Sequence, residues 1–463
     1  RCAAVTELAQ PAERFREVAR RNLADAHVQE AYAAATTRMR DGRLAAWAGL
    51  PNVEELRQRA HEIRMRTIDD LDRYHAEFRS ALEAVGGVVH ACRDAEEACA
   101  AVVGICRSVD ARLVAKSKSM ASEEIGLNEA LEAAGVRAVE TDLGEYILQL
   151  AGRTPEHIIL PAIEETAPEV SALFSEAEGV PVSAELGDLA KSARRQLRRV
   201  FLEADVGVTG ANFGVAETGS LCVVTNEGNG GLVTSLPRVH VALLGLERLV
   251  PTLQDLAVLL QLLPRSATGQ KLTSYTRLFT GPRREGESDG PEQLHVIVID
   301  NGRTNLRRGR YKEMLACIRC GACLNVCPVY RKGGGGAYGP VYSGPMGAVF
   351  VPLLTRLERA PALPHASSLC GACSDACPVK IPLHELLLEL RRDLVGERVT
   401  PLRERLAFTL WSWLWSSVLG YRVSTALARI GRPLAALAGP GRAWAAGREL
   451  PRFARRRFRD RRP

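Results

Sequence analysis

Apolar residues recur at helical spacing over the first part of the chain, from residue 11 to about residue 85. The clearest run begins at Asn52, with Glu55 three residues later, a pairing typical of a helix N-terminus. It ends at Gly86 and Gly87. The apolar positions of this run are Leu56, Ile63, Ile68, Leu71, Phe78 and Leu82. The pattern predicts a long, charged helix that packs along another surface of the protein.

Short apolar runs alternate with helical stretches from residue 88 to about residue 302. Helices are expected at 94–107, 122–134 and 252–263. The apolar runs are VVHA, ARLVA, VRAVE, HIIL, GVTGANFGVAETGSLCVV, RVHVALLGL, LTSYTRLF and LHVIVID. Such alternation is typical of an α/β layered domain.

The rest of the chain contains two cysteine-rich runs and an apolar segment. The glycines at 333–336, between the cysteine runs, lack the Lys-Ser/Thr pair of a phosphate-binding loop, so we expect a flexible connection. The apolar run LAFTLWSWLWSSVL has 14 residues, whereas crossing a bilayer takes about 20. We therefore predict four parts: a helical N-terminal segment (1–75), the α/β domain (76–302), a cysteine-rich α-helical domain (303–400) and a C-terminal amphipathic segment with an Arg-rich tail (401–463).

The net charge of +7 is concentrated at the C-terminus. The last twelve residues hold seven Arg and one Asp, so the rest of the chain is nearly neutral. We therefore do not expect its folded domains to bind nucleic acid. Together with Trp411, Trp413 and Trp415, this tail suits contact with anionic lipid or an acidic partner. The N-terminal residues lack the apolar core of a signal peptide. We expect a cytoplasmic protein with peripheral contact at the inner face of the membrane.

Seven of the twelve cysteines follow ferredoxin spacing. The first run has the pattern C-x2-C-x2-C-x3-C-P, in which the fourth cysteine binds a neighbouring cluster. The second run repeats its last three positions. If each run gives its final cysteine to the cluster of the other run, the seven cysteines hold two iron–sulfur clusters. Cluster 1 would be held by Cys317, Cys320, Cys323 and Cys377, and cluster 2 by Cys327, Cys370 and Cys373.

Cluster 2 lacks one cysteine, because Ser367 stands at the vacant position. Three interpretations of cluster 2 are open. It could be a [4Fe-4S] cluster with a non-cysteine ligand or water at one iron, a [3Fe-4S] cluster, or a cluster whose fourth ligand comes from elsewhere, such as His365 or Cys222. We prefer the four-iron cluster with an exchangeable site. Structural zinc is the alternative for CxxC pairs, but zinc sites seldom use seven cysteines with Cys-Pro at both ends.

The motifs together resemble a known family. CIRCGACLNVCPVYRK, SLCGACSDACPVKIPLHELL, AKSKSMASEEIGLNEALEAAG and TGANFGVAETGSLCVVTNEGNGG are similar to stretches of the lactate utilisation protein B family, iron–sulfur subunits of a bacterial three-part L-lactate oxidation system. The resemblance runs from near residue 20 to beyond residue 400.

The resemblance implies an α/β domain similar to CoA-transferases and sugar-phosphate isomerases, followed by an α-helical two-cluster ferredoxin domain. It implies two partners: a Cys-rich subunit similar to heterodisulfide reductase subunits, and a second small protein with the same α/β domain. It also implies that three cysteines for cluster 2 are a family feature.

A substrate site is less clearly marked. No dinucleotide or P-loop motif is present, so neither flavin nor NAD is predicted. Lys116 and Lys118 could bind a carboxylate, although solvated loop charges are the preferred interpretation. Glu217 could accept an acyl group but could equally be structural. Asn212, Thr218 and Asn226 could contact a polar ligand, and His240 is expected to be a core residue.

Three functional hypotheses follow. The first is an electron-transfer subunit of a complex that oxidises L-lactate to pyruvate and passes electrons towards the respiratory chain. The second is an acyl or CoA transferase in which the clusters have a structural or sensing role. The third is a non-catalytic scaffold that positions partners.

Overall fold

The computed structural model describes residues 12–435 and residue 454. The chain divides into two compact units, residues 1–393 and 394–463. The division falls inside helix α19 (Leu383–Gly396). The N-terminal segment, the α/β domain and nearly all of the cysteine-rich region therefore belong to one unit.

The N-terminal segment is a series of shorter helices, so the prediction of one long helix after Asn52 is wrong. Asp70 leaves helical geometry (φ −105°, ψ 28°) and separates two helices, and the Asn52 side chain makes no capping hydrogen bond. The predicted apolar face is largely correct, since Ile63, Phe78 and Leu82 are completely buried. The helices are α2 (Ala12–Ala24), α3 (Ala26–Ala48), α4 (Val53–Asp69) and α5 (Leu71–Glu83).

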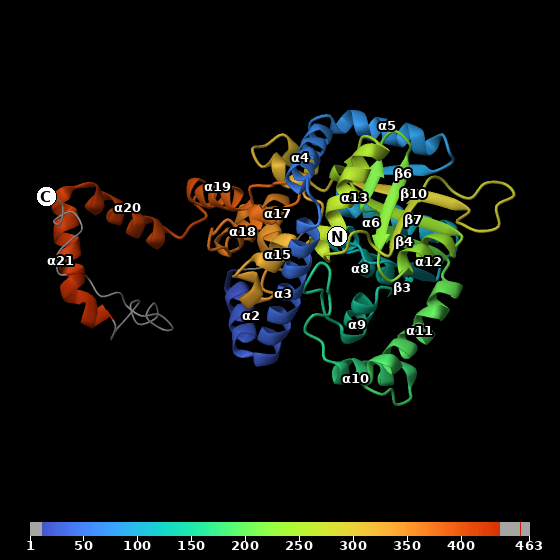
Figure 1. The fold of residues 1–463 in the computed structure, drawn as a ribbon, viewed down its shortest axis with the longest axis horizontal. Helices are drawn as coiled ribbons and strands as arrows, with labels where there is room; N and C mark the ends of the chain where they lie inside the picture. Colours follow the sequence, from blue (N-terminus) through green and yellow to red (C-terminus); the bar gives the residue numbers. More distant parts are fainter. Residues whose placement is uncertain (1–11, 436–453, 455–463) are drawn as a thin grey trace. The chain divides into compact units, whose positions relative to one another are not determined.

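A six-stranded parallel sheet forms the centre of the α/β domain (Figure 1). Its order is β1-β10-β7-β4-β2-β3, and every neighbouring pair is parallel. Strand β7 is buried along its whole length, as expected for a parallel sheet covered on both faces. The strands are β1 (Val88–Cys92), β2 (Leu113–Lys116), β3 (Arg137–Glu140), β4 (Val206–Gly210), β7 (Val239–Gly245) and β10 (Gln293–Ile299).

Alternate residues of the strands supply two cores. Val239, Val241 and Leu243 of β7 pack against α6 (Ala95–Ser108), α7 (Met120–Ile125) and α8 (Leu127–Ala133). On the other face, Ala242 and Leu244 pack with α5 and a second sheet. The helix expected at 122–134 is broken at Gly126, whose φ of 67° ends α7.

The second sheet is smaller and mixed, with the order β8-β5-β6-β9. Its strands are β5 (Phe213–Val215), β6 (Ser220–Thr225), β8 (Leu249–Val250) and β9 (Tyr275–Phe279). Helices α12 (Asn229–Ser235) and α13 (Leu253–Ala267) accompany it. A third apolar cluster joins α9 (Leu143–Ala151), α10 (Ala167–Glu178) and α11 (Leu186–Glu203) at the β3 edge.

The apolar run at 157–160 is not a strand. The imidazole Nδ1 of His157 accepts hydrogen bonds from the backbone N–H groups of Ile159 and Leu160, at 3.0 and 3.2 Å. Those N–H groups are therefore not bonded to a neighbouring strand. The ring's Nε2 donates to Oδ1 of Asn325, 3.0 Å away in the cysteine-rich region. Burial lowers the pKa of His157 to about 4, which keeps this link neutral at pH 7.

The cysteine-rich region is built from short helices that pack on the N-terminal ones. Helix α15 lies against α3 and α18, so segments far apart in sequence are neighbours (Figure 1). Helix α16 lies against α2 and α3. The helices are α14 (Arg303–Arg307), α15 (Ala322–Val326), α16 (Tyr330–Gly333), α17 (Gly344–Thr355) and α18 (Ala372–Asp375).

The glycine-rich stretch is a packed segment, which corrects the expected flexible connection. Gly335 lies so close to the Glu156 carbonyl that an added Cβ would stand 1.7 Å from that oxygen. The Gly335 N–H donates to the Tyr32 hydroxyl, and the Tyr330 hydroxyl donates to the Glu156 carbonyl, both at 2.9 Å. The segment thus ties the α/β domain to the cysteine-rich region.

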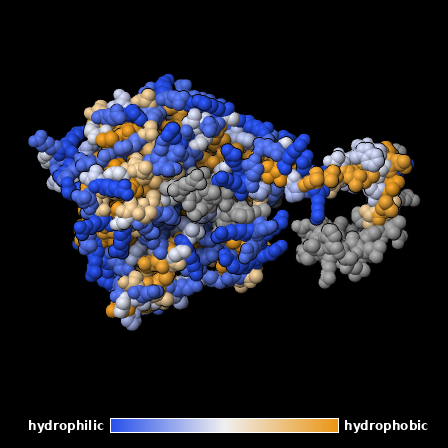
Figure 2. Space-filling view, turned by 180° about the vertical axis from the view of Figure 1, so that it is seen from behind, coloured by the Kyte–Doolittle hydropathy of each residue, from blue (hydrophilic) through white to orange (hydrophobic). Residues whose placement is uncertain are grey.

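The second unit contains helices α20 (Leu402–Ser416) and α21 (Val418–Ala435). Apolar side chains gather on its surface (Figure 2), and Trp413 is 70% exposed. Within the described residues, none of the helices is both long and apolar enough to cross a membrane. The Arg-rich tail lies outside the described residues, apart from Ala454.

Candidate functional site

The two cysteine loops share one backbone conformation. Arg319 and Leu369, at equivalent positions, both adopt a left-handed conformation, with φ of 59° and 56°. Gly321 and Gly371, two residues further on, follow with φ of 75° and 84°. Left-handed Arg and Leu are uncommon, so their coincidence shows that the sequence repeat is also a structural repeat.

Four cysteines from the two loops line one cavity. Cys317, Cys320 and Cys323 come from the first loop, and Cys377 comes from the second. Burial raises the pKa of Cys377 to about 12, and the nearby Cys317 thiol adds to the shift. Iron binds the thiolate form, so these thiols must release their protons when a cluster is assembled.

The other three cysteines form a second group. Burial raises the pKa of Cys373 to about 11, with further contributions from the Cys327 and Cys370 thiols beside it. Cys370 is exposed, and the Ala372 N–H lowers its pKa. The two groups adjoin, because helices α15 and α18 pack together. The crossed assignment of these cysteines to two clusters remains a prediction.

Ser367 occupies the position that Cys317 has in the first loop. The Leu369 N–H donates to the Ser367 hydroxyl at 3.1 Å, just as the Arg319 N–H donates to the Cys317 sulfur at 3.5 Å. Cys222, proposed as another source of a ligand, is buried in β6 with its pKa raised to about 12 by burial. His365 is exposed in the turn before Ser367.

Helix α4 binds both loops through side chains spaced along its length. Arg57 donates to the Cys377 carbonyl at 2.8 Å, and the His61 ring lies 2.9 Å from the Val379 carbonyl. Arg64, completely buried, donates to the carbonyls of Leu315 and Ala316 just before the first loop. A charged helix thereby positions both cysteine loops.

A buried charge network connects the first loop to the α/β domain. Arg303 donates to both carboxylate oxygens of Glu124 at 2.8 Å and also pairs with Glu247. Glu247 in turn pairs with Arg319 at 3.2 Å. Arg248 donates to the Cys317 carbonyl at 2.8 Å. Sequence reasoning missed these residues because nothing local distinguishes them from surface charges.

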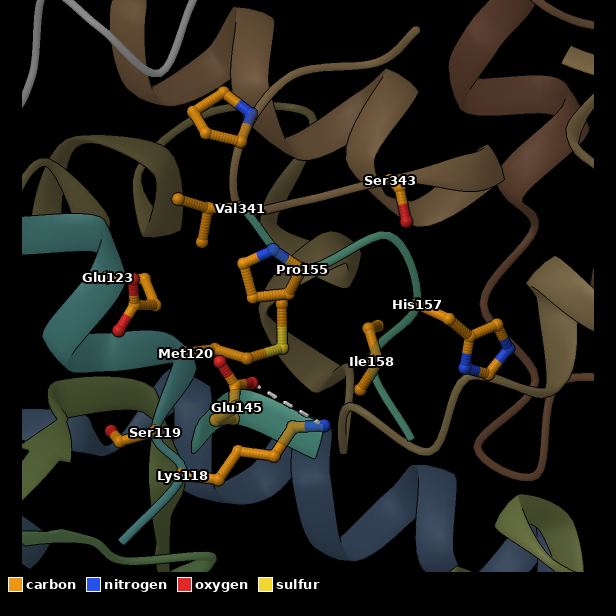
Figure 3. A pocket seen from close by; sticks show the side chains of 11 residues that line it. Lys118, Ser119, Met120, Glu123, Glu145, Pro155, His157, Ile158, Val341 and Ser343 are labelled. Carbon is orange, nitrogen blue, oxygen red and sulfur yellow. Dashed lines mark ion pairs between the residues drawn. The ribbon is translucent and has the colours of Figure 1, made fainter. Parts of the chain in front are cut away.

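Lys116 and Lys118 do not have the solvated positions that we expected. Lys116 ends β2, is completely buried, and contacts Glu140, Glu123 and Asn128 at 2.7, 2.9 and 2.8 Å. Its three N–H donors are therefore all used. Lys118 is largely buried, and its Nζ lies 3.7 Å from Glu145 in a small cavity beside His157 (Figure 3).

The remaining candidates divide between structural and cavity positions. Glu217 accepts a hydrogen bond from the Leu253 N–H at 2.6 Å, the contact of a group that caps helix α13. Thr218 bonds to Ser220 within its own turn. Asn212 and Asn226 line a large cavity of the α/β domain. His240 is buried and bonded to Thr209 at 2.8 Å, as expected of a core histidine.

Within the described part of the chain, no three His, Cys, Asp or Glu side chains are grouped so that they could hold a single metal ion. A four-iron cluster distributes its thiolates around a larger core. Fold and site together define an iron–sulfur protein in which a parallel α/β domain adjoins a ferredoxin-type region.

Comparisons with known proteins agree. Residues 75–299 match the LUD domain model, and residues 313–381 match the 4Fe-4S dicluster domain model. Lactate utilization protein B of Macrococcus caseolyticus is 50% identical over 396 residues, covering 85% of this chain and 83% of the relative. That of Bacillus thuringiensis is 45% identical over 444 residues, 94% of each chain. The chain therefore belongs to the lactate utilisation protein B family, which confirms the expected family and its iron–sulfur region.

Among solved structures, a DUF162 family protein from Deinococcus radiodurans aligns with 50% of this chain and 98% of its own. Its TM-score is 0.28 and its sequence identity is 14%.

Proposed function

We propose that this protein is the iron–sulfur electron-transfer subunit of a multi-subunit system that oxidises L-lactate to pyruvate and passes electrons towards the respiratory chain. The names of its relatives support the lactate assignment. The dicluster match supports the redox role, because iron–sulfur clusters transfer electrons without changing their ligands.

The observation that carries the proposal is the cavity lined by cysteines of both loops. We assign Cys317, Cys320, Cys323 and Cys377 to cluster 1, and Cys327, Cys370 and Cys373 to cluster 2. Cluster 2 is proposed to be a [4Fe-4S] cluster with a non-cysteine fourth site, or a [3Fe-4S] cluster. Ser367 occupies the position equivalent to Cys317, but a hydroxyl is far less acidic than a thiol and is a poor substitute for a thiolate ligand.

The proposed partners are a Cys-rich subunit similar to heterodisulfide reductase and a second small protein with a LUD-type domain. The exposed Cys370 makes cluster 2 the one more accessible to a redox partner. For the α/β domain we propose a fold of the CoA-transferase and sugar-isomerase type, a likeness supported by the parallel sheet alone.

Purified full-length protein is expected to contain about seven to eight iron atoms per chain. Its broad absorption at about 400 nm should be lost on reduction with dithionite. Electron paramagnetic resonance (EPR) of the oxidised protein separates the two forms of cluster 2, because an oxidised three-iron cluster is paramagnetic and a four-iron cluster is not. One or two zinc ions and no iron would contradict the proposal.

We also propose peripheral binding to the inner face of the membrane through the second unit. The protein is expected to co-sediment with vesicles containing anionic phospholipid and to be released by high salt, since an Arg-rich tail binds by electrostatics. Trp413→Ser should weaken this binding by about tenfold, because a large exposed apolar group is lost.

Leu186→Ser, which changes a residue 76% exposed on α11 of the first unit, serves as the control and should bind like the unaltered protein. Equal binding of all three proteins, or equal binding to neutral phosphatidylcholine vesicles, would count against a membrane role for the second unit.

A further inference from the structure

The large cavity of the α/β domain lies at the position where open parallel sheets bind ligands. The chain leaves β2 towards β3 on one side, whereas it leaves β4 towards β7 on the other. Side chains and backbone at the carboxyl ends of β2 and β4 line the cavity, among them Ser117, Lys118, Gly210 and Asn212. Such a reversal of strand order opens a crevice for ligands. The cavity volume of about 430 Å³ is that of a small-molecule site.

Positive charge predominates along one wall of this cavity. Three guanidinium groups, those of Arg248, Arg303 and Arg319, line it together with the Glu247 carboxylate, and Glu124 pairs with Arg303 outside the lining, leaving an excess of one positive charge. Asp142 and Glu227 also line the cavity, but burial, reinforced by Asp142, raises the pKa of Glu227. Guanidinium groups can donate paired hydrogen bonds to a carboxylate.

Lys118 provides an ammonium group without a hydrogen-bond acceptor. Its Nζ is buried, and within the described residues it has no partner at hydrogen-bonding distance. The nearest carboxyl is that of Glu145 at 3.7 Å, and the two side chains point towards one another in Figure 3. Burial raises the pKa of Glu145 to about 8, so this carboxyl is largely neutral at pH 7. A buried cation with a neutral neighbour is costly unless a ligand pairs with it.

The cavity also adjoins the four cysteines of the proposed cluster 1. Arg319 and Ile158 line both the ligand cavity and the cysteine cavity, so single side chains separate the two spaces. The Arg319 N–H donates to the Cys317 sulfur, while its guanidinium group pairs with Glu247 of the α/β domain. A bound molecule would therefore lie next to the first redox centre.

We propose that this cavity binds a small organic carboxylate, the 2-hydroxy acid or its 2-oxo product, with Lys118, Arg248 and Arg319 supplying the charge that holds the carboxylate. This inference rests on the proposed function and assigns the substrate to this subunit. Because the cavity is larger than a three-carbon acid, it also accommodates water around the ligand.

The test is calorimetric titration of the full-length, cluster-containing protein with sodium pyruvate and with sodium L-lactate. Binding at millimolar or lower concentration is expected. Lys118→Met should raise the dissociation constant by about tenfold or more, because a charge-assisted hydrogen bond is lost. Lys191→Met, which removes a lysine whose side chain is 71% exposed, should leave it unchanged. No binding of either acid, or equal binding by both variants, would overturn the proposal.

EPR of the reduced, unaltered protein tests the inference without a variant, so the result cannot be affected by a variant that fails to fold. Pyruvate is expected to alter the signal of cluster 1 and to leave that of cluster 2 unchanged, since only the first adjoins the cavity. An unchanged cluster 1 signal at saturating pyruvate contradicts the inference but leaves the proposed function standing. A protein that binds pyruvate yet contains no iron contradicts the proposed function instead.

Discussion

Cys377→Ala is expected to eliminate the cluster of the first cysteine loop, even though Cys377 belongs to the second. Cys377 lines the cavity of Cys317, Cys320 and Cys323, and removing one thiolate ligand of a four-cysteine cluster leaves an iron without its ligand. About half of the iron, about four atoms per chain, should be lost. The remaining EPR signal should match that of Cys320→Ala, because both variants retain only cluster 2.

The reciprocal variant completes this test. Cys327→Ala should resemble Cys373→Ala, since both remove ligands of cluster 2 and leave cluster 1 intact. Cys106→Ala is the matched control, because Cys106 is a completely buried cysteine in the core beside the parallel sheet, and it should retain all iron. If Cys377→Ala instead loses the same signal as Cys373→Ala, each loop holds its own cluster and the crossed assignment is wrong.

Arg303→Met is expected to lower the free energy of unfolding by about 3–5 kcal/mol, because it leaves buried carboxylates without their cation. Arg303 is 2% exposed and contacts Glu124, which is completely buried, and Glu247. Arg238→Met removes an ion pair with Glu292 at the surface and should cost at most about 1 kcal/mol. Urea unfolding followed by circular dichroism, under anaerobic conditions, measures both. Equal losses would show that the buried network contributes no more than a surface pair.

The same pair predicts a pH dependence. Burial by itself would raise the pKa of Glu124, but Arg303 more than offsets this and holds the pKa at about 2. The unfolded carboxyl has a pKa of about 4.3, so the stabilisation is complete above that pH and is lost as pH falls towards 2. The difference in stability between the unaltered protein and Arg303→Met should therefore shrink between about pH 4 and pH 2. A constant difference would exclude Glu124 as the group responsible.

Several features of the fold could be predicted from sequence because neighbours in the chain determine them. The spacing of cysteines indicated an iron–sulfur region, and short apolar runs indicated β1, β2, β7 and β10. The run is clearest for β7, since a strand buried on both faces must be apolar along its length. The two errors in helix boundaries have local causes. Asp70 and Gly126 adopt non-helical dihedral angles within otherwise helical patterns.

Other features depended on contacts between distant segments. The run at 157–160 reads as a strand, yet the His157 ring takes its backbone donors and joins Asn325, 168 positions away in the sequence. Gly335 reads as part of a flexible loop, yet it packs against Glu156. In both cases the residue that determines the conformation is distant in sequence, so a pattern of neighbouring residues cannot reveal it.

The sequence alone determined the class of fold, the family and the cysteines available for two clusters, because period and spacing are properties of adjacent residues. Only the tertiary structure decided which cysteines share a cavity. It also decided that Lys116 is paired with the buried Glu140 carboxylate, and that Lys118 and Arg319 line the same ligand-sized cavity. The physical reason is that the burial and pairing of a charge depend on partners brought together by folding, and the identity of a residue does not specify those partners.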